Sequence, residues 1–191
     1  MTQIILASTS PRRRELMKGL GIKFITDTCE VDESVSEGTS PPDMVRILSL
    51  RKAKAVSSKY KEGLVIGSDT IVVLDGIILG KPKDDKDAFL MLYKLQGKKH
   101  QVYSGVAIID ARYDKAEVSC EKTDVYFRSM TEEEVYRYIA TKEPQGKAGS
   151  YAIQGLGSTI VQSIEGDYFN VVGLPLFLLG KMLKGFGVEV F

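Results

Sequence analysis

The strongest β-strand signals in the chain are two neighbouring apolar runs, residues 64–66 and 71–74 of the string LVIGSDTIVVL. Short runs rich in Val, Ile and Leu predict buried strands. An Asp75-Gly76 pair and a further apolar run at residues 77–79 follow directly. Asp-Gly between two strands is typical of a two-residue hairpin, because both of its positions need a positive φ angle. Any fold of this chain therefore has to be built around a β-sheet that contains this hairpin.

Helical and strand patterns alternate on both sides of the hairpin. Further strands are expected over residues 4–7, 100–109 and 116–127, with a last hairpin turning through residues 165–167. Helices are expected over residues 11–20, 41–58, 84–97, 131–141 and 174–183. Thr131 and Glu134 have the spacing of a capping box, which predicts the start of the fourth of these helices. Parallel-type βα units combined with long hairpin strands predict a single mixed α/β domain, residues 1–191, around one long twisted mixed sheet.

The composition narrows the classes of function. Lysine and arginine number 26 against 25 for aspartate and glutamate, so the chain lacks the basic excess expected of a general nucleic-acid-binding protein. No signal peptide or membrane-spanning run is recognised, and a soluble cytoplasmic protein without a membrane partner is expected. Cys29 and Cys120 are expected to stay reduced. His100, the only histidine, excludes a multi-histidine zinc site and is expected to be a surface or structural residue.

A cluster of arginines marks the start of the first predicted helix. Ser10 is placed to cap this helix, and Pro11 suits its first position. Arg12, Arg13 and Arg14 then fill the first turn, where the partial positive charge of the helix end disfavours cations. A capped helix start that carries cations anyway can bind an anion through its free N–H groups and an arginine fork. The sequence leaves two interpretations open here, an anion site and a solvated basic patch.

A single carboxylate interrupts the central strand. Asp69 lies where a strand packed between two layers normally carries Val or Ile. Such a carboxylate has to be paired, bind a metal ion or point into a cavity. The alternative is an aspartate at a sheet edge that bonds a loop. Asp69 is therefore a candidate site residue.

Two lysines are candidates for binding an anion. At about 100° per residue, Lys52 falls on the apolar stripe of its helix, although snorkelling toward solvent explains the same pattern. Lys81 lies at the end of a predicted strand, where ligand-binding crevices form. The string 76–81 is too short for a P-loop, and Pro82 replaces its Mg²⁺-binding hydroxyl, so ATPase and kinase chemistry are excluded.

These candidates fall inside a series of motifs that covers nearly the whole chain. In order, the motifs are LASTSPRRREL, the Asp32-Glu33 pair, RKAKA, GSDTIV, LGKP, KLQGKKHQVYSGV, KAGSYAIQGLGS and VVGLPL. Together they resemble the Maf family of nucleotide pyrophosphatases, whose members share an ITPase-like α/β fold. The resemblance implies an enzyme that hydrolyses a nucleoside triphosphate to the monophosphate and pyrophosphate.

The resemblance also implies roles for individual residues. Asp69 matches the family's general base, which activates a water for attack on the α-phosphorus, and Glu33 matches a site carboxylate placed with Asp69 at the metal. The expected triphosphate-binding residues are Ser8, Arg13, Lys52 and Lys81. Mg²⁺, or another divalent cation such as Mn²⁺, is the expected cofactor, and a homodimer is the expected assembly. Several cations and a metal suit phosphoryl chemistry, which needs neutralised oxygens more than covalent help.

The residues at three positions match the branch of the family that acts on dTTP and UTP. They are Arg12, Thr70 and Gln154, whereas the 7-methyl-GTP branch tends to carry an aromatic residue, Gln and Glu there. An amide offers both a donor and an acceptor to the edge of uracil or thymine. The expected substrates are dTTP, UTP or a modified pyrimidine triphosphate, and the expected role is house-cleaning of nucleotide pools.

Two other hypotheses stay open at this point. One assigns the same chemistry to another base, such as a modified uridine or a purine. The other assigns a non-enzymatic role in septum formation or cell division, which has been attached to the family. The cations expected around Asp69 favour an enzyme, because a pure binding module has no need for a carboxylate opposite them.

Overall fold

A mixed β-sheet is the centre of the computed structural model, which describes residues 2–191. Within these residues the sheet has seven strands, in the order β2-β1-β3-β5-β6-β7 with β4 paired to β3. The strands are β1 (Ile4–Leu6), β2 (Ile25–Thr26), β3 (Leu64–Leu74), β4 (Ile77–Leu79), β5 (Lys99–Asp110), β6 (Lys115–Phe127) and β7 (Val161–Glu165). β1 pairs in parallel with β2 and β3, while the β3–β4 and β6–β7 pairs are antiparallel. The predicted mixed α/β sheet is therefore confirmed.

All but one of the helices begin within two residues of where the sequence predicts. They are α1 (Pro11–Gly19), α2 (Pro41–Ser57), α3 (Asp85–Leu95), α4 (Glu132–Ala140), α5 (Tyr168–Val172) and α6 (Leu176–Gly185). Ser10, Ser40, Asp84 and Thr131 each accept a hydrogen bond from a backbone N–H in the first turn. The capping box of Thr131 and Glu134 is confirmed in both directions.

Two expectations from composition can be compared with the structure. Within residues 2–191, no helix has the length and apolar character needed to cross a membrane. Cys29 and Cys120 are both free thiols, as expected.

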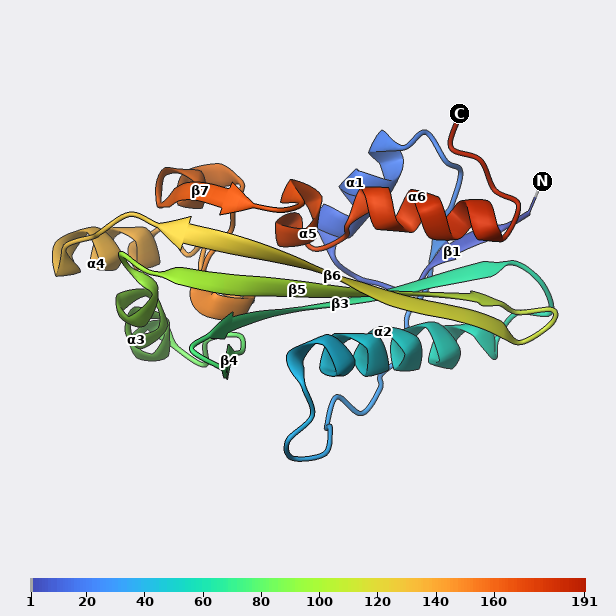
Figure 1. Cartoon of the computed structure of the whole chain (residues 1–191), viewed down its shortest axis with the longest axis horizontal. Helices are drawn as coiled ribbons and strands as arrows, with labels where there is room; N and C mark the ends of the chain where they lie inside the picture. The colour runs from blue at the N-terminus through green and yellow to red at the C-terminus, as the bar shows by residue number, and fades with distance from the viewer. Residues whose placement is uncertain (1) are drawn as a thin grey trace. The chain divides into compact units, whose positions relative to one another are not determined.

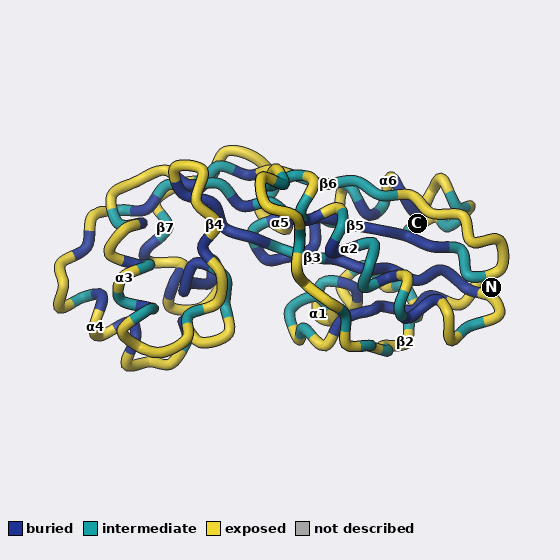
Figure 2. The backbone as a smooth tube through the Cα atoms, turned by 90° about the horizontal axis from the view of Figure 1, so that it is seen from below, coloured by how far each residue is buried: buried dark blue, intermediate teal, exposed yellow. Residues whose placement is uncertain are grey.

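The chain divides into two compact units. Unit 1 holds residues up to 69, together with 104–121 and 173–191, and unit 2 holds residues 70–103 and 122–172. β3, β5 and β6 each contribute residues to both units. β3 is buried along most of its length (Figure 2).

Unit 1 has helices on both faces of its strands. Successive residues of a strand point to opposite faces, so each strand supplies two sets of core residues. On one face, α1 and α6 bury residues such as Met17 and Leu179 against Ile4, Leu6 and Ile66. On the other face, α2 packs against the alternate set, which includes Ile5, Val65 and Ala107. Figure 1 shows α2 on one side of the strands and α1 and α6 on the other.

Two glycines let α2 lie directly on the sheet. A Cβ atom at Gly67 of β3 would lie 2.2 Å from the carbonyl oxygen of Ser49 and 2.7 Å from the backbone nitrogen of Ala53. A Cβ atom at Gly105 of β5 would lie 2.1 Å from the carbonyl oxygen of Val45. Val45, Ser49 and Ala53 follow one another at four-residue spacing along α2, so one line of helix backbone touches the sheet. No residue with a side chain fits at either strand position without moving the helix.

Unit 2 has a separate apolar core. Residues of α3 and α4, among them Leu92 and Val135, pack against Val72, Leu79 and Val102 of the strands. The turn between β3 and β4 has φ angles of 50° at Asp75 and 79° at Gly76. The predicted two-residue hairpin is therefore confirmed.

His100 belongs to the core of unit 2. Its side chain is completely buried, with Nε2 2.8 Å from the hydroxyl of Tyr151 and the ring edge-on to Phe127. Burial lowers the pKa of His100 to about 4. The imidazole is therefore neutral at pH 7, which agrees with a structural residue and excludes a surface one.

The predicted hairpin through residues 165–167 is wrong. β7 pairs with β6, but the chain then enters the short helix α5 instead of a further strand. The side chain of Asp167 accepts a hydrogen bond from the backbone N–H of Phe169 at 2.7 Å, which turns the chain into the helix. The amide of Asn170 then donates to the carbonyl of Val102 and to the hydroxyl of Thr123, both at 3.0 Å. These contacts to distant strands fix α5, and no local pattern indicates them.

Candidate active site

The loop between β1 and α1 places two serines and an arginine together. Ser8 is buried at the end of the first strand, and its Oγ accepts a hydrogen bond from the backbone N–H of Ser10 at 3.2 Å. The Oγ of Ser10 in turn accepts from the backbone N–H of Arg13 at 3.4 Å. Because Pro11 occupies the first helical position, the helix starts without an unsatisfied N–H there. The result is a capped helix start from which Arg13 projects.

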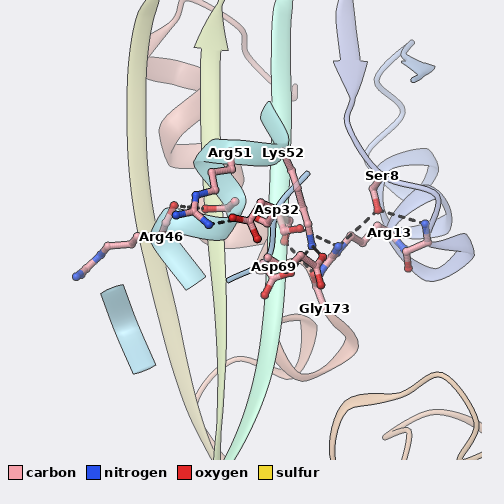
Figure 3. Close-up of polar contacts among 12 residues, drawn as sticks. Ser8, Arg13, Asp32, Arg46, Arg51, Lys52, Asp69 and Gly173 are labelled. Carbon is pink, nitrogen blue, oxygen red and sulfur yellow. Dashed lines mark hydrogen bonds and ion pairs between the residues drawn. The ribbon is translucent and has the colours of Figure 1, made fainter. Parts of the chain in front are cut away.

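The guanidinium of Arg13 is held by backbone carbonyls. Its Nε donates to the carbonyl of Gly173 at 2.8 Å (Figure 3). One terminal nitrogen donates to the carbonyl of Ser68 at 2.9 Å. The hydroxyl of Ser68 donates to the same Gly173 carbonyl at 3.2 Å. Burial lowers the pKa of Arg13, and the neighbouring carboxylate of Asp69 opposes that shift. The positive charge is thus fixed beside Asp69 before any ligand binds.

Lys52 joins the two carboxylates that the sequence singled out. Its ammonium lies 2.5 Å from an oxygen of Asp69 and 2.7 Å from an oxygen of Glu33. The side chains of Lys52 and Asp69 are only 20% and 13% exposed, whereas that of Glu33 is 60% exposed. A partly buried lysine between two carboxylates is therefore a charged cluster, and the snorkelling interpretation of Lys52 is excluded.

The position of Gly67 explains why Lys52 reaches Asp69. Residues i and i+2 of a strand point to the same face, so Asp69 points to the face on which Gly67 touches α2. Lys52 precedes Ala53, which is the helix residue in contact with that glycine. The close approach of helix and strand brings the ammonium within reach of the carboxylate.

Arg51 holds the loop that carries Glu33. One terminal nitrogen of Arg51 donates to the carbonyl of Asp32 at 2.9 Å and also to the carbonyl of Ser34. The carboxylate of Asp32 accepts from the hydroxyl of Ser34 at 2.7 Å and from its backbone N–H at 2.8 Å, and these bonds lower the pKa of Asp32. Figure 3 shows Arg51 and Lys52 on the same turn of α2. Sequence reasoning missed Arg51, because its partners are backbone carbonyls of a distant loop.

The chemistry of Asp69 and Glu33 fits a shared divalent cation. Within residues 2–191, no group of three or more histidine, cysteine, aspartate or glutamate side chains is arranged to hold a metal ion. Mg²⁺ commonly uses one or two carboxylates together with water and substrate phosphates, and does not need such a group. Asp69 and Glu33, which both contact the ammonium of Lys52, supply two carboxylates, and this is within the number that Mg²⁺ commonly uses.

The structure thus brings together Ser8, Arg13, Glu33, Lys52 and Asp69, all in unit 1. Arg12 belongs to the same helix start and is partly buried. The other predicted residues belong to unit 2: Thr70 is partly buried in β3, and Lys81 and Gln154 are exposed. The roles of all these residues stay predictions.

Comparison with known proteins gives one consistent result. The family model described as "Maf-like protein" matches residues 3–186. A protein of Pelotomaculum thermopropionicum named dTTP/UTP pyrophosphatase is 52% identical over 190 residues, which is 100% of both chains. Proteins of the same name from Alkaliphilus oremlandii and Bacillus cereus are 51% and 50% identical, over 96% and 100% of this chain and 96% and 98% of their own. This chain therefore belongs to the Maf family.

Proposed function

We propose that this protein hydrolyses dTTP and UTP to the nucleoside monophosphate and pyrophosphate. The observation that carries the proposal is the cluster of Asp69, Lys52 and Glu33 beside the fixed Arg13. A general base surrounded by cations suits attack of water on a polyphosphate. Full-length relatives at about 50% identity that are named dTTP/UTP pyrophosphatase support the same substrates. Nothing favours the alternative of a non-enzymatic regulator of cell division.

Each residue of the cluster has a defined task in this reaction. Asp69 takes a proton from a water whose oxygen bonds to the α-phosphorus, while the bond from that phosphorus to the α,β-bridging oxygen breaks. Pyrophosphate leaves with the electrons of the broken bond. Ser8, Arg13 and Lys52 donate hydrogen bonds to phosphate oxygens and offset their charge. Lys81 is a further phosphate ligand on the family resemblance alone.

Glu33 and Asp69 would hold the divalent cation, with Mg²⁺ as the proposed ion and Mn²⁺ as a substitute. Bound there with the phosphates, the cation would neutralise charge on the triphosphate. The proposal also includes a homodimer and a role in clearing nucleotide pools, which rest on the family resemblance, and a cytoplasmic location, which rests on the sequence pattern.

A panel of nucleoside triphosphates tests the proposed function directly. Pyrophosphate release is measured from dTTP, UTP, dCTP, dATP, dGTP and 7-methyl-GTP, with Mg²⁺ and with EDTA. We expect dTTP and UTP to have the highest kcat/KM, and EDTA to abolish turnover. If the purified chain releases no pyrophosphate from either pyrimidine, the proposal is wrong.

Changing Gln154 to glutamate is expected to alter the choice of base. The amide can donate to a pyrimidine carbonyl and accept from N3–H, whereas glutamate removes the donor and adds a negative charge. An enzyme that recognises a base by hydrogen bonds loses much of its kcat/KM when one of the hydrogen-bonding groups is removed. We expect kcat/KM for UTP and dTTP to fall by about 10- to 100-fold. Activity toward 7-methyl-GTP is expected to fall less or to rise.

The matched control for this variant is Gln162→Glu, which adds the same charge at an exposed position of β7. It is expected to leave all three kcat/KM values near those of the wild type. An equal loss on every triphosphate in Gln154→Glu would show that Gln154 supports its loop and does not read the base.

A further inference from the structure

The backbone around Gln154 is held by one carboxylate. Glu143, in the loop after α4, accepts hydrogen bonds from the backbone N–H groups of Leu156 at 3.0 Å and Gly157 at 2.8 Å. Each carboxylate oxygen accepts one of these two hydrogen bonds. The oxygen that accepts from Gly157 also accepts a hydrogen bond from the hydroxyl of Tyr138 at 2.8 Å. The C-terminal side of the Gln154 turn is therefore fastened to Glu143.

The N-terminal side of the turn is fastened to the same pair of residues. The hydroxyl of Tyr138 accepts a hydrogen bond from the backbone N–H of Ala152 at 3.3 Å. Tyr138 is 6% exposed and lies on α4, within the apolar core of unit 2. Gln154 thus lies between two anchored points of the backbone, at Ala152 and Leu156.

The glycines of this turn fit the carboxylate closely. Gly155 has a φ angle of 72°, and a Cβ atom there would lie 2.5 Å from an oxygen of Glu143. A Cβ atom at Gly157 would lie 2.1 Å from the carbonyl oxygen of Ala152 and 2.6 Å from the Tyr138 hydroxyl. The turn is therefore shaped around the Glu143–Tyr138 pair.

The backbone of Glu143 is also held in place. The backbone N–H of Glu143 donates to the hydroxyl of Thr141 at 3.2 Å, and its carbonyl accepts from the ammonium of Lys147. Burial raises the pKa of Glu143, but the hydrogen bonds from Tyr138, Gly157 and Leu156 outweigh it and hold the pKa below the usual value. Glu143 is therefore an ionised acceptor at neutral pH.

The side chain of Gln154 lies at the centre of the anchored turn and is not engaged by other residues of the described chain. Gln154 is exposed, and no other residue of the described chain, 2–191, makes a hydrogen bond to its side chain. An ordered backbone that presents a polar side chain without a protein partner is suited to binding a ligand. Two of the hydrogen bonds that the Glu143 carboxylate accepts come from this turn.

From this arrangement we infer that Glu143 is a positioning residue for base recognition, which acts by fixing the turn that carries Gln154. The inference rests on the proposed function, since it concerns how the same enzyme selects a pyrimidine. Glu143 does not touch the substrate in this scheme. Its effect on the base passes entirely through Gln154.

A double-mutant cycle tests this dependence. The variants are Glu143→Gln, Gln154→Ala and the double variant, measured for kcat and KM with dTTP and for binding of dTMP by calorimetry. Glutamine keeps the size of the side chain but places an NH₂ group against one of the two backbone donors. We expect Glu143→Gln to raise KM and the Kd for dTMP by about tenfold in the wild-type background. In the Gln154→Ala background the same change is expected to alter both by less than about twofold.

Controls separate positioning from folding. Glu132→Gln removes a charge from the exposed first turn of α4 and is expected to match the wild type. Tyr138→Phe removes one partner of Glu143 and the acceptor for Ala152, so it is expected to change KM in the same direction. If Glu143→Gln does not fold, Tyr138→Phe takes its place in the cycle.

The outcomes distinguish the inference from the function on which it rests. Additive effects of the two changes, or a loss of Tm with KM unchanged, would overturn the role of Glu143 while leaving the pyrophosphatase intact. A wild-type protein that neither hydrolyses dTTP or UTP nor binds dTMP would overturn both.

Discussion

Asp69→Asn is expected to lower kcat for dTTP and UTP by about 10²- to 10⁴-fold, the usual contribution of a general base. Asparagine keeps the shape of the side chain and can still accept a hydrogen bond from Lys52, but it cannot take a proton from water. Lys52 also keeps its second partner, Glu33, at 2.7 Å. The fold should therefore survive, and the loss should appear in kcat. Steady-state pyrophosphate release and a thermal melt of the same sample measure both effects.

The matched control is Asp75→Asn, at the exposed turn where β3 ends. Asp75 has a φ angle of 50°, which asparagine adopts readily. This variant should keep kcat within about twofold of the wild type, as surface substitutions usually do. Near-normal turnover in Asp69→Asn would show that Asp69 is not the general base, whatever the kcat of Asp75→Asn.

Gly67→Ala is expected to destabilise the protein by about 3 kcal/mol, at the upper end of the usual cost of overpacking. The new methyl group would lie 2.2 Å from the Ser49 carbonyl oxygen and 2.7 Å from the Ala53 nitrogen. Both atoms belong to the backbone of α2, so the helix has to move as a whole. For a chain of this size the change corresponds to a fall in Tm of roughly 6–12 °C. Thermal and urea unfolding measure it.

Gly19→Ala provides the comparison for this substitution. Gly19 is the last residue of α1, and a Cβ atom there would have no neighbour within 4 Å. Alanine favours helix over glycine, so Tm should stay the same or rise slightly. An equal Tm for Gly67→Ala and the wild type would contradict the direct contact between α2 and β3. Because that contact brings Lys52 to Asp69, the folded fraction of Gly67→Ala should also lose activity.

Local rules predicted most elements of this fold. The caps at Ser10 and Thr131 and the turn at Asp75-Gly76 depend on neighbours within three residues, and the structure has each of them. The placement of Lys52 with the apolar face of its helix depends only on helical periodicity, and its side chain is 20% exposed.

The features that sequence reasoning missed all depend on contacts between distant segments. The Asn170 side chain, which fixes α5, bonds residues 68 and 47 positions away. Arg51 bonds the carbonyl of Asp32, 19 positions away, and backbone carbonyls leave no trace in side-chain patterns. Glu143 resembles any other loop glutamate until the turn at Gly157 is folded against it. Such contacts become apparent only when the tertiary structure is known.

The bond between Arg13 and the carbonyl of Gly173 has a consequence for protein synthesis. The two residues are 160 positions apart, so at roughly 5–20 residues per second the ribosome adds Gly173 about 8–32 s after Arg13. During that interval the nascent chain also lacks α6, which covers apolar residues such as Leu6 and Met17. A growing chain therefore exposes this apolar face, and its Arg13 lacks one of the two backbone carbonyls that hold it in the finished protein. Only chains that extend past Gly173 can complete both of these contacts.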